Sequence, residues 1–470
     1  MAAEAESVAH RPVVASFIDD TQTPVSAFLK LRRYAGGGPA FLLESAEQGL
    51  RVGRWSFIGI KPRALVRWSL GDPGDPYDLV RQEVGAIAKP PLDLPGDQPP
   101  FLGGAVGYFG YDLVRTVEEL GPPNPDPLGI PDLALLLCDL LVAFDHLKHR
   151  VIVIANAARG EERAQEEIAA VQAALAEPLP PPPPRPKQPL PRFRSNMSRE
   201  RFEAVVARII EYIYAGDIFQ AVPSQRFEAE LPCAPFSVYR GLRAINPSPY
   251  MYFLDFGEFQ LAGTSPEPLL TVNGRTATTK PVAGTRPRGT DPTADEQIAR
   301  ELLADPKERA EHVMLVDLAR NDLGRVCAPA TVRVKRLMEV ERYSHVMHIV
   351  SEVSGRLREG VDALGALRAL LPAGTLSGAP KVRAMEIIDE LEPVKRCSYG
   401  GAVGYLSYTG DLDTCIHIRT VVIKDGKAYI QSGGGTVADA KPDRELAESL
   451  AKAQGMIEAV ELACQQEGWE

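Results

Sequence analysis

A run of prolines divides this chain, and it limits the possible folds more than any other feature of the sequence. Residues 180–184 are five consecutive prolines inside a proline-rich stretch over 178–191. Neither a helix interior nor a central strand tolerates such a run, because proline lacks a backbone N–H. A polyproline II linker fits this composition, and a ligand for a proline-binding module is the alternative. We therefore predict globular regions over 12–175 and 196–460, joined by a linker over 176–195.

Composition and charge exclude several classes of protein. Of the 470 residues, 45% are hydrophobic and 24% are charged, which is typical of a soluble globular protein. The sequence has no apolar run of about 18 residues, so we expect no membrane partner. The net charge of −10 argues against nucleic acid as a partner, because such proteins usually carry a basic face.

The N-terminal sequence and the cysteines indicate a compartment. The first twelve residues are small and polar and lack the basic start and apolar core of a signal peptide. None of the six cysteines lies in a C-x-x-C pair, which favours reduced thiols over zinc ligands. We therefore expect a cytoplasmic protein.

The region before the linker is expected to mix helices and strands. Apolar runs over 135–141 and 151–154 predict buried strands, and 164–175 predicts a short helix. The glycine-rich segment 103–110 is interleaved with aromatic residues and predicts a strand and a turn. No lysine follows its glycines, so a phosphate-binding loop is not expected.

The region after the linker begins with a clear helix signal. Apolar residues recur at helical spacing between a possible N-cap, Ser198, and a possible terminator, Gly216. Further along we predict a strand-rich section to about residue 283, two helical segments around 296–323, two or three strands over 402–432, and a final helix from about Arg444.

Two of the predicted helices carry paired glutamates. Asp305 is a possible N-cap, and Glu308 and Glu311 then share one helix face. Glu445 and Glu448 repeat this spacing on the final helix, with a lysine one turn further on. Two such faces that converge could hold Mg²⁺ through carboxylate oxygens, whereas the alternative is a capping residue and solvated glutamates.

A hairpin signal lies close to the second glutamate pair. The Asp-Gly turn at 425–426 predicts that strands over 414–423 and 427–432 pair with residue numbers summing to 851. This register places Arg419 opposite Ser432, beside a loop suited to grip a carboxylate through backbone N–H groups and a guanidinium. A flexible loop with a surface arginine is the alternative. The loop consists of Gly433, Gly434 and Gly435.

Two histidines, His345 and His348, lie on one predicted strand. If the strand is regular, their side chains face opposite ways, since alternate residues share a face. One of them could act as a general acid or base, but the pattern does not choose between them.

Four long motifs resemble the chorismate-binding enzymes, a family of anthranilate, aminodeoxychorismate, isochorismate and salicylate synthases. The resemblance covers most of 198–457 and is looser before the linker. It implies an α+β fold with two antiparallel sheets packed face to face and helices outside. The motifs are LVDLARND at 315–322, GTLSGAPK at 374–381, IIDELE at 387–392 and YGGAVGY at 399–405.

The resemblance also implies roles for individual residues. Glu311 and Glu448 are similar to the Mg²⁺ ligands of the family, with Glu308 and Glu445 beside them. His348, not His345, occupies the position of the catalytic histidine, and Thr375 is implied to lie near it. The residues similar to chorismate contacts are Gly284, Thr285, Tyr399, Arg419, Gly433, Gly434, Gly435 and Lys452.

One position separates the members of the family. Aminodeoxychorismate, isochorismate and salicylate synthases commonly carry a lysine where Ala283 stands. Alanine neither attacks the ring nor activates water, but it leaves room for ammonia. Lys280 would face the other side of a strand and is a poor substitute. The chain thus resembles component I of the anthranilate synthases, with an aminodeoxychorismate synthase or a non-catalytic tryptophan-sensing protein as alternatives.

That resemblance implies a reaction, a partner and an inhibitor. Ammonia would add at C2 of chorismate as the C4 hydroxyl leaves, and loss of pyruvate would then give anthranilate. The chain shows no glutamine amidotransferase motif, so we expect a separate small subunit, component II, in a heterotetramer of two large and two small subunits. Residues 42–45 and 246–251 resemble a tryptophan feedback site that includes Ser45, Pro249, Tyr250 and Met251.

Overall fold

The computed structural model describes residues 12–46, 53–85, 98–156, 160–179, 188–342, 346–466 and 468–469. The five prolines of the predicted linker and His345 lie outside these residues, as do the first eleven positions. Among the described residues, no helix combines the length and the apolar character that crossing a membrane requires.

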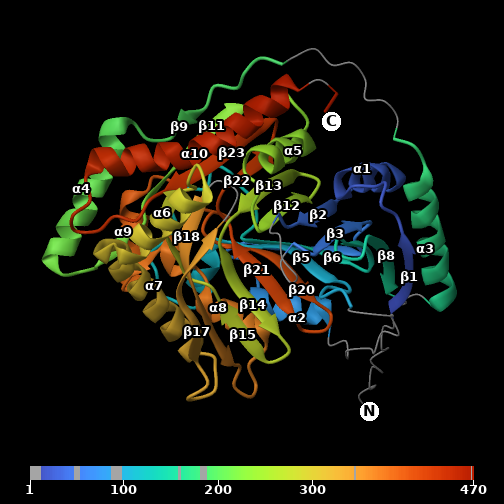
Figure 1. The fold of residues 1–470 in the computed structure, drawn as a ribbon, viewed down its shortest axis with the longest axis horizontal. Coiled ribbons are helices and arrows are strands. Elements are labelled where there is room, and N and C mark those ends of the chain that lie inside the picture. Colours follow the sequence, from blue (N-terminus) through green and yellow to red (C-terminus); the bar gives the residue numbers. More distant parts are fainter. Residues whose placement is uncertain are drawn as a thin grey trace.

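Two large antiparallel sheets form the body of the molecule (Figure 1). The first sheet has eleven strands in the order β1 (Pro12–Ile18), β8 (Arg150–Asn156), β7 (Leu140–Asp145), β3 (Trp55–Ile60), β2 (Ala40–Glu44), β12 (Tyr250–Asp255), β13 (Phe259–Ser265), β22 (Thr420–Lys424), β23 (Lys427–Gly433), β11 (Ser224–Glu230) and β9 (Arg194–Ser195).

The second sheet has ten strands. Its order is β16 (Val282–Pro287), β18 (Val346–Arg356), β15 (Thr276–Thr279), β14 (Pro268–Asn273), β21 (Leu412–Ile416), β20 (Ala402–Ser407), β5 (Gly104–Phe109), β6 (Leu133–Cys138) and β4 (Ala64–Trp68), and β17 (Arg333–Arg342) pairs with β18. A separate two-stranded sheet joins β10 (Gln220–Ala221) to β19 (Gly378–Ala379).

The sheets pack face to face, because alternate residues of each strand enter different cores. In β7, Leu141 belongs to the core between the sheets, whereas Leu140 and Val142 belong to the core outside the first sheet. In β6, Leu136 likewise points between the sheets and Leu135 outward. The predicted face-to-face sheets with helices outside are confirmed.

Helices cover the outer faces of both sheets. The outer core of the first sheet includes residues of α1 (Pro24–Tyr34), α3 (Glu161–Ala176), α5 (Pro235–Ile245) and α10 (Pro442–Gln465). The outer core of the second sheet includes residues of α2 (Pro76–Val84), α7 (Pro306–Gly324) and α8 (Ala363–Leu370).

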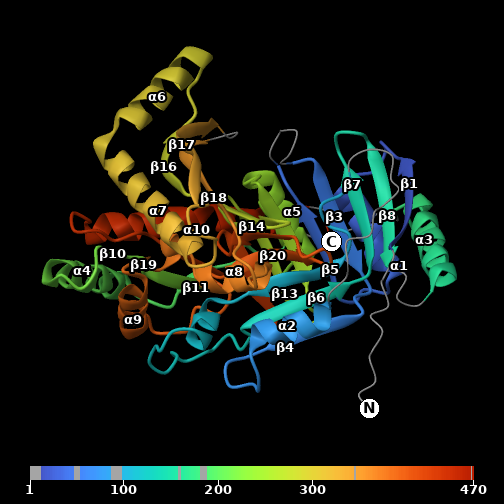
Figure 2. The ribbon, with the colours of Figure 1, turned by 90° about the horizontal axis from the view of Figure 1, so that it is seen from below.

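The remaining helices lie at one end of the molecule. α4 (Arg199–Ala215) and α9 (Lys381–Leu391) share a smaller core, and α6 (Pro292–Ala304) stands out from the sheets above α7 (Figure 2). Two short 3-10 helices are η1 (Tyr111–Thr116) and η2 (Gly374–Leu376).

Helix ends follow the predicted local signals. Ser198 caps α4 by accepting a hydrogen bond from the Arg201 N–H, and Gly216 ends the helix in the left-handed region at φ 86°. The Asp305 carboxylate caps α7 by accepting from the N–H groups of Lys307 and Glu308. Both predictions are confirmed, because caps depend on neighbours in the sequence.

Strand boundaries differ from the prediction where the chain passes between sheets. The apolar run 135–141 is two strands, β6 and β7, which belong to different sheets on either side of Asp139. The predicted strand 414–423 is likewise divided into β21 and β22. Both predictions of a single strand were wrong, because continuous apolar runs hide a change of sheet when both sheets are buried on two faces.

The predicted strand-rich section to residue 283 is confirmed but also contains a helix, and the predicted number of strands over 402–432 was too low. The section to residue 283 contains the helix α5, whose Phe236, Val238 and Tyr239 are residue types common in strands. Region 402–432 holds four strands, β20 to β23, where two or three were predicted.

The regions on either side of the predicted linker contribute strands to both sheets. In the first sheet β2 pairs with β12, so that Glu44 stands beside Met251. In the second sheet β5 pairs with β20, which begins almost 300 residues later (Figure 1). The predicted boundaries at 175 and 196 are therefore divisions of the sequence and not of the sheets.

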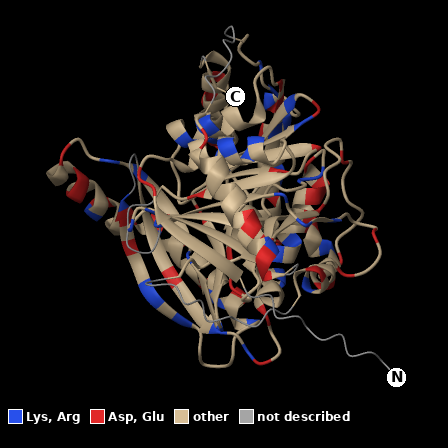
Figure 3. Ribbon diagram, turned by 90° about the vertical axis from the view of Figure 1, so that its right-hand side faces the viewer, with Lys and Arg blue, Asp and Glu red and all other residues tan. Residues whose placement is uncertain are grey.

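Acidic and basic residues are intermingled along the fold. Figure 3 shows Lys and Arg positions and Asp and Glu positions scattered over many helices and strands. The net charge of −10 is thus spread over many elements.

Candidate active site

The two glutamate pairs singled out in the sequence, on α7 and α10, lie near enough for their charges to interact. A Cβ atom built on Gly434, which follows β23, would lie 3.1 Å from Glu445 Oε2 and 3.4 Å from Glu448 Oε1. On the other side, a Cβ on Gly284 would lie 3.0 Å from Glu308 Oε2. The two glycines therefore bring backbone close to both carboxylate pairs, as only residues without a side chain allow.

Two of these glutamates, Glu311 and Glu445, have raised pKa values, chiefly through burial and then through neighbouring carboxylates. Burial, followed by the charge of Glu448, raises the pKa of Glu445 to about 7. Burial and then Glu308 raise the pKa of Glu311, and Glu448 contributes to the same shift. The effects of Glu448 on Glu311 and of Glu311 on Glu445 require that α7 and α10 lie near each other here.

A cation would relieve this repulsion, and one oxygen is placed to receive it. Glu445 Oε2 is buried and has no hydrogen-bond partner among the described residues. The described residues hold no ready-made group of three or more metal-binding side chains. Mg²⁺ does not need one, because it usually keeps several waters and takes one or two carboxylates. The residues present fit such a site.

Cationic side chains adjoin the glutamates. Lys452 Nζ lies 2.6 Å from Glu448 Oε1 and donates a hydrogen bond of 3.1 Å to the Gly433 carbonyl. Arg419 lies in the segment that joins β21 of the second sheet to β22 of the first. Its guanidinium donates a hydrogen bond of 3.5 Å to the Lys452 carbonyl. Burial lowers the pKa of Arg419, whereas Tyr399 and Glu448 oppose this shift.

His348 lies on β18 beside the bulge at Gly284. Its Nδ1 is 3.1 Å from the Gly284 carbonyl and 3.1 Å from Thr285 Oγ1. Since a carbonyl only accepts, Nδ1 carries the proton and Nε2 does not. Burial lowers the pKa of His348, and the charge of Arg419 lowers it further. The imidazole is thus neutral at pH 7 and suited to accept a proton through Nε2.

Sequence reasoning missed one carboxyl group, that of Glu267. Glu267 accepts a hydrogen bond of 3.0 Å from Thr375 Oγ1, and burial raises its pKa to about 7. Lys452 is close enough to moderate that shift. The available signal was an acidic residue set between two prolines and followed by two leucines. This hydrogen bond is the contact observed for Thr375, and its expected proximity to His348 stays a prediction.

A buried ion pair supports three segments of the site from behind. Arg396 and Glu392 are 3% and 5% exposed, and their side chains form two hydrogen bonds. Arg396 also donates to the carbonyl of Leu376, next to Thr375, and lies 5.7 Å from the Tyr399 ring centre. Glu392 accepts from the N–H and hydroxyl of Ser224, the register partner of Gly433.

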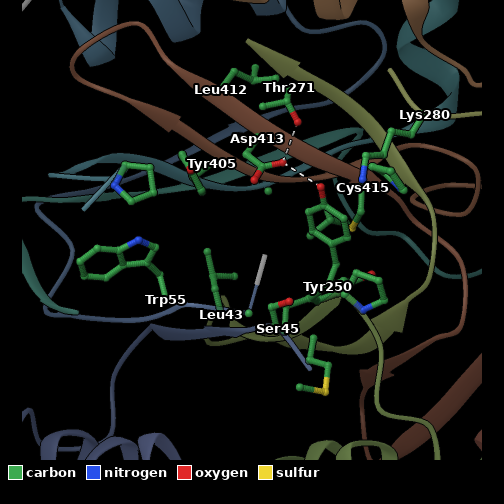
Figure 4. Close-up of a pocket in the computed structure, with 18 of the residues that line it drawn as sticks. Leu43, Ser45, Trp55, Tyr250, Thr271, Lys280, Tyr405, Leu412, Asp413 and Cys415 are labelled. Atoms are coloured by element: carbon green, nitrogen blue, oxygen red, sulfur yellow. Dashed lines mark hydrogen bonds between the residues drawn. The ribbon is translucent and has the colours of Figure 1, made fainter. Parts of the chain in front are cut away.

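A separate cavity of about 450 Å³ lies between the two sheets. Ser45, Pro249, Tyr250 and Met251, predicted as one site, all line it (Figure 4). Its wall is mainly apolar and includes Trp55 from β3. In Figure 4 the Asp413 carboxylate accepts hydrogen bonds from Tyr250 and Thr271, at 3.0 and 3.2 Å. The volume is in the usual range for small-molecule sites.

The structure places both Lys280 and Ala283, the two positions used to distinguish members of the family. Lys280 lines the cavity between the sheets and lies 3.9 Å from the carboxylate of Glu341. Ala283 precedes the bulge at Gly284 and pairs with Ile349. Lys280 lies in the link between β15 and β16, whereas Ala283 lies on β16, so the prediction that they occupy opposite faces of one strand was wrong.

The sequence matches a known family over most of its length. A family model described as "chorismate binding enzyme" matches residues 38–458. Anthranilate synthase component 1 from Pseudomonas putida is 48% identical, over 96% of this chain and 95% of that protein. Anthranilate synthase component 1 from Thermus thermophilus is 47% identical, over 96% of this chain and 98% of that protein.

Solved structures agree with these matches. Anthranilate synthase component I from Streptococcus pneumoniae superposes with a TM-score of 0.79 and 38% identity, covering 88% of this chain and 94% of that one. The menaquinone-specific isochorismate synthase from Escherichia coli has a TM-score of 0.71 at 19% identity, covering 96% and 95%, and so shares the fold.

Proposed function

This chain belongs to the chorismate-binding enzyme family, and from that premise we propose that it is the large subunit of an anthranilate synthase. It would convert chorismate and ammonia to anthranilate and pyruvate, the first committed step of tryptophan synthesis. The observation that carries the proposal is Ala283 at the active-site bulge, in a chain that is similar to component 1 proteins over 96% of its length.

The alanine argues for ammonia as the nucleophile. The family resemblance implies that a lysine at position 283 would reach the reacting ring, whereas the methyl group of Ala283 would leave room for ammonia. Lys280 does not occupy that position, because it lies before β16 and its ammonium group lies 3.9 Å from the Glu341 carboxylate.

Mg²⁺ is the cofactor that we propose for the glutamate cluster. Glu311 and Glu448 would hold it, with Glu308 and Glu445 beside them, directly or through water. When bound, the ion neutralises the carboxylates and supplies positive charge that binds an anionic substrate. The raised pKa of Glu445 and its unpartnered oxygen support this assignment.

The chain's own residues divide the remaining work. Arg419 and Lys452, with the N–H groups of the glycine loop, would bind the carboxylates of chorismate. Glu267, held by Thr375, would donate a proton to the C4 oxygen as water leaves and ammonia adds at C2. The unprotonated Nε2 of His348 would then take up the C2 proton as pyruvate is eliminated and the ring becomes aromatic.

Ammonia would come from a partner. The relatives are named component 1, and this chain carries no amidotransferase motif, so a glutamine-hydrolysing component 2 is the proposed source. We propose the assembly of two large and two small subunits in the cytoplasm. Alone, the chain should use ammonium and not glutamine.

Tryptophan is the proposed occupant of the cavity between the sheets. Ser45 and Tyr250 offer hydrogen-bonding groups, and Trp55 and Met251 offer apolar surface to an indole ring. The cavity shares Lys280 and Pro268 with a smaller one that is lined by Glu267 and Thr375. A ligand there would thus adjoin the catalytic residues without touching the substrate.

Product identification tests the proposal. The purified chain is incubated with chorismate, Mg²⁺ and ammonium, and the products are separated by chromatography. Anthranilate and pyruvate in equal amounts are expected. 4-Amino-4-deoxychorismate would select the aminodeoxychorismate synthase, isochorismate an isochorismate synthase, and unchanged chorismate a non-catalytic sensor.

A further inference from the structure

Two cysteines that are 231 residues apart meet where α10 ends. Cys233 precedes α5, and Cys464 lies in the last turn of α10. Their sulfur atoms are 3.3 Å apart, and neither forms a disulfide in the structure. A disulfide bond is about 2.05 Å long, so a small rotation of the side chains would bring the sulfurs to bonding distance.

The packing of α5 against α10 holds the two thiols together. A Cβ on Gly241 of α5 would lie only 2.2 Å from the Ala459 carbonyl of α10, so the two helices approach closely. Cys464 belongs to the buried core there, and Cys233 packs against it. The approach of the sulfurs therefore follows from the packing of α10 against α5 and against the segment that leads into α5.

The two thiols differ in a way that suits sequential chemistry. Cys233 is partly exposed, whereas Cys464 is 3% exposed. A small reagent thus reaches Cys233 first. The hydrogen bond with Cys233 lowers the pKa of Cys464, which favours its thiolate.

We propose that Cys233 and Cys464 are a dithiol site that closes to an intramolecular disulfide when a small-molecule disulfide oxidises it. The Cys233 thiolate attacks one sulfur of the oxidant and expels the other half as a thiol. The Cys464 thiolate then attacks the Cys233 sulfur of the mixed disulfide and expels the second small thiol. Two protein thiols become one disulfide, and the oxidant is reduced to two thiols.

The bond would tie the end of α10 to the segment that leads into α5. α10 also carries Glu445, Glu448 and Lys452, so the cross-link would act on the helix that supplies half of the proposed metal site. It would close a loop over about half of the chain, which restricts the unfolded state and raises thermal stability.

Oxidised glutathione tests the proposal on the folded chain. After incubation without denaturant, two of the six thiols should be lost, and digestion without reductant should yield one peptide pair that joins Cys233 to Cys464. The cross-linked chain should melt at a higher temperature than the reduced chain. Dithiothreitol should restore both the thiols and the original melting temperature.

Single variants separate this site from other thiols. Cys464→Ser should stop at a stable glutathione adduct on Cys233, and Cys233→Ser should lose no thiol at this site. Cys327→Ala, which lies in the other outer core, should still form the cross-link. A persistent glutathione adduct on Cys233 of the unchanged chain would overturn the proposal, as would a lower melting temperature after cross-linking.

Discussion

At the residue scale, the site depends on two residues with a left-handed backbone. Arg419 has φ 52° at the point where the chain leaves one sheet for the other, and Gly284 has φ 64° in the bulge of β16. Glycine adopts this conformation at little cost, whereas arginine does so only when its surroundings require it. The passage from β21 to β22 fixes the backbone of Arg419, and the Arg419 carbonyl accepts a hydrogen bond from the Thr264 N–H.

The proton held by Glu267 predicts a pH dependence. Its pKa is raised to about 7, so the carboxyl is protonated below that pH and loses its proton as the pH rises. If it is the acid that protonates the leaving hydroxyl, kcat should fall as the pH rises through about 7. Glu267→Gln should lower kcat by about 100-fold or more, the usual range for general acids.

Measuring kcat over a pH series for the wild-type chain and for Glu267→Gln checks this role. The threonine hydroxyl donates to Glu267 Oε1 and lowers the pKa of that carboxyl. Thr375→Val should therefore move the fall in kcat to higher pH. An unchanged pH profile in Glu267→Gln would assign the proton transfer to another group.

His348 should act in the second half of the reaction. Replacing it with alanine removes the proposed base for the C2 proton, so pyruvate release should slow more than amination. Rapid-quench chromatography should then show an aminated, non-aromatic intermediate that accumulates. A variant that simply stops consuming chorismate would show that His348 is needed before ammonia adds.

At the scale of helices and strands, the glutamate pairs of α7 and α10 should behave as one unit. Glu311→Gln and Glu448→Gln each remove a charge from the proposed Mg²⁺ site, so each should raise the Mg²⁺ concentration needed for half-maximal activity. Glu461→Gln on the last turns of α10 is a matched control and should leave that concentration unchanged. An unchanged Mg²⁺ dependence in both Glu311→Gln and Glu448→Gln would show that α7 and α10 do not hold the metal.

The ion pair of Glu392 and Arg396 should position substrate contacts. Glu392→Gln weakens its hold on Ser224 and on the arginine that faces Tyr399, so KM for chorismate should rise by about tenfold, or ~1.4 kcal/mol. Removing one charge of a buried pair typically costs stability, about 3–5 kcal/mol. Melting curves recorded beside the kinetics measure that loss.

A second buried pair provides the control. Asp145 and Arg54 are 2% and 8% exposed and form two hydrogen bonds at the far end of the first sheet. Asp145→Asn should lower the melting temperature to a similar degree while KM stays unchanged. Equal KM values for Glu392→Gln and Asp145→Asn would show that Glu392 contributes to stability only.

Local signals allowed some elements to be predicted and not others. The caps at Ser198 and Asp305 and the turn at 425–426 depend on a few neighbouring residues, and the register of β22 and β23 followed from that turn. The ladder ends at Val421 and Ile430, so the predicted pairing of Arg419 with Ser432 was wrong. The crossings between sheets depend on which distant strand each residue meets, so no local pattern marks them. Glu267 was missed for the same reason, since burial and a partner 108 residues away determine its pKa.

At the scale of the whole molecule, the cavity between the sheets should connect tryptophan to catalysis. Tryptophan should inhibit, and Ser45→Ala or Met251→Ala should weaken inhibition while uninhibited activity remains. Both residues line the cavity and neither belongs to the proposed substrate site. Inhibition requires that tryptophan bind the less active arrangement more tightly than the active one.

A tryptophan titration with melting curves checks this connection. Bound tryptophan should raise the melting temperature of the wild-type chain, and less so in the variants. If Ser45 only caps a local turn, Ser45→Ala should lose about 1 kcal/mol of stability and keep its inhibition curve. If tryptophan neither inhibits the wild-type chain nor raises its melting temperature, the cavity does not bind tryptophan.

The sharing of both sheets by distant segments has a consequence for synthesis of the chain. β5 begins at residue 104 and its partner β20 at residue 402, so 298 further residues must leave the ribosome before the two can pair. At about 5–20 residues per second this takes roughly 15–60 s. Throughout that wait the edges of β2 and β5 present unpaired backbone groups, the kind of edge that invites aggregation. A nascent chain of this design therefore gains more from chaperones that shield strand edges than one built from domains that close in sequence order.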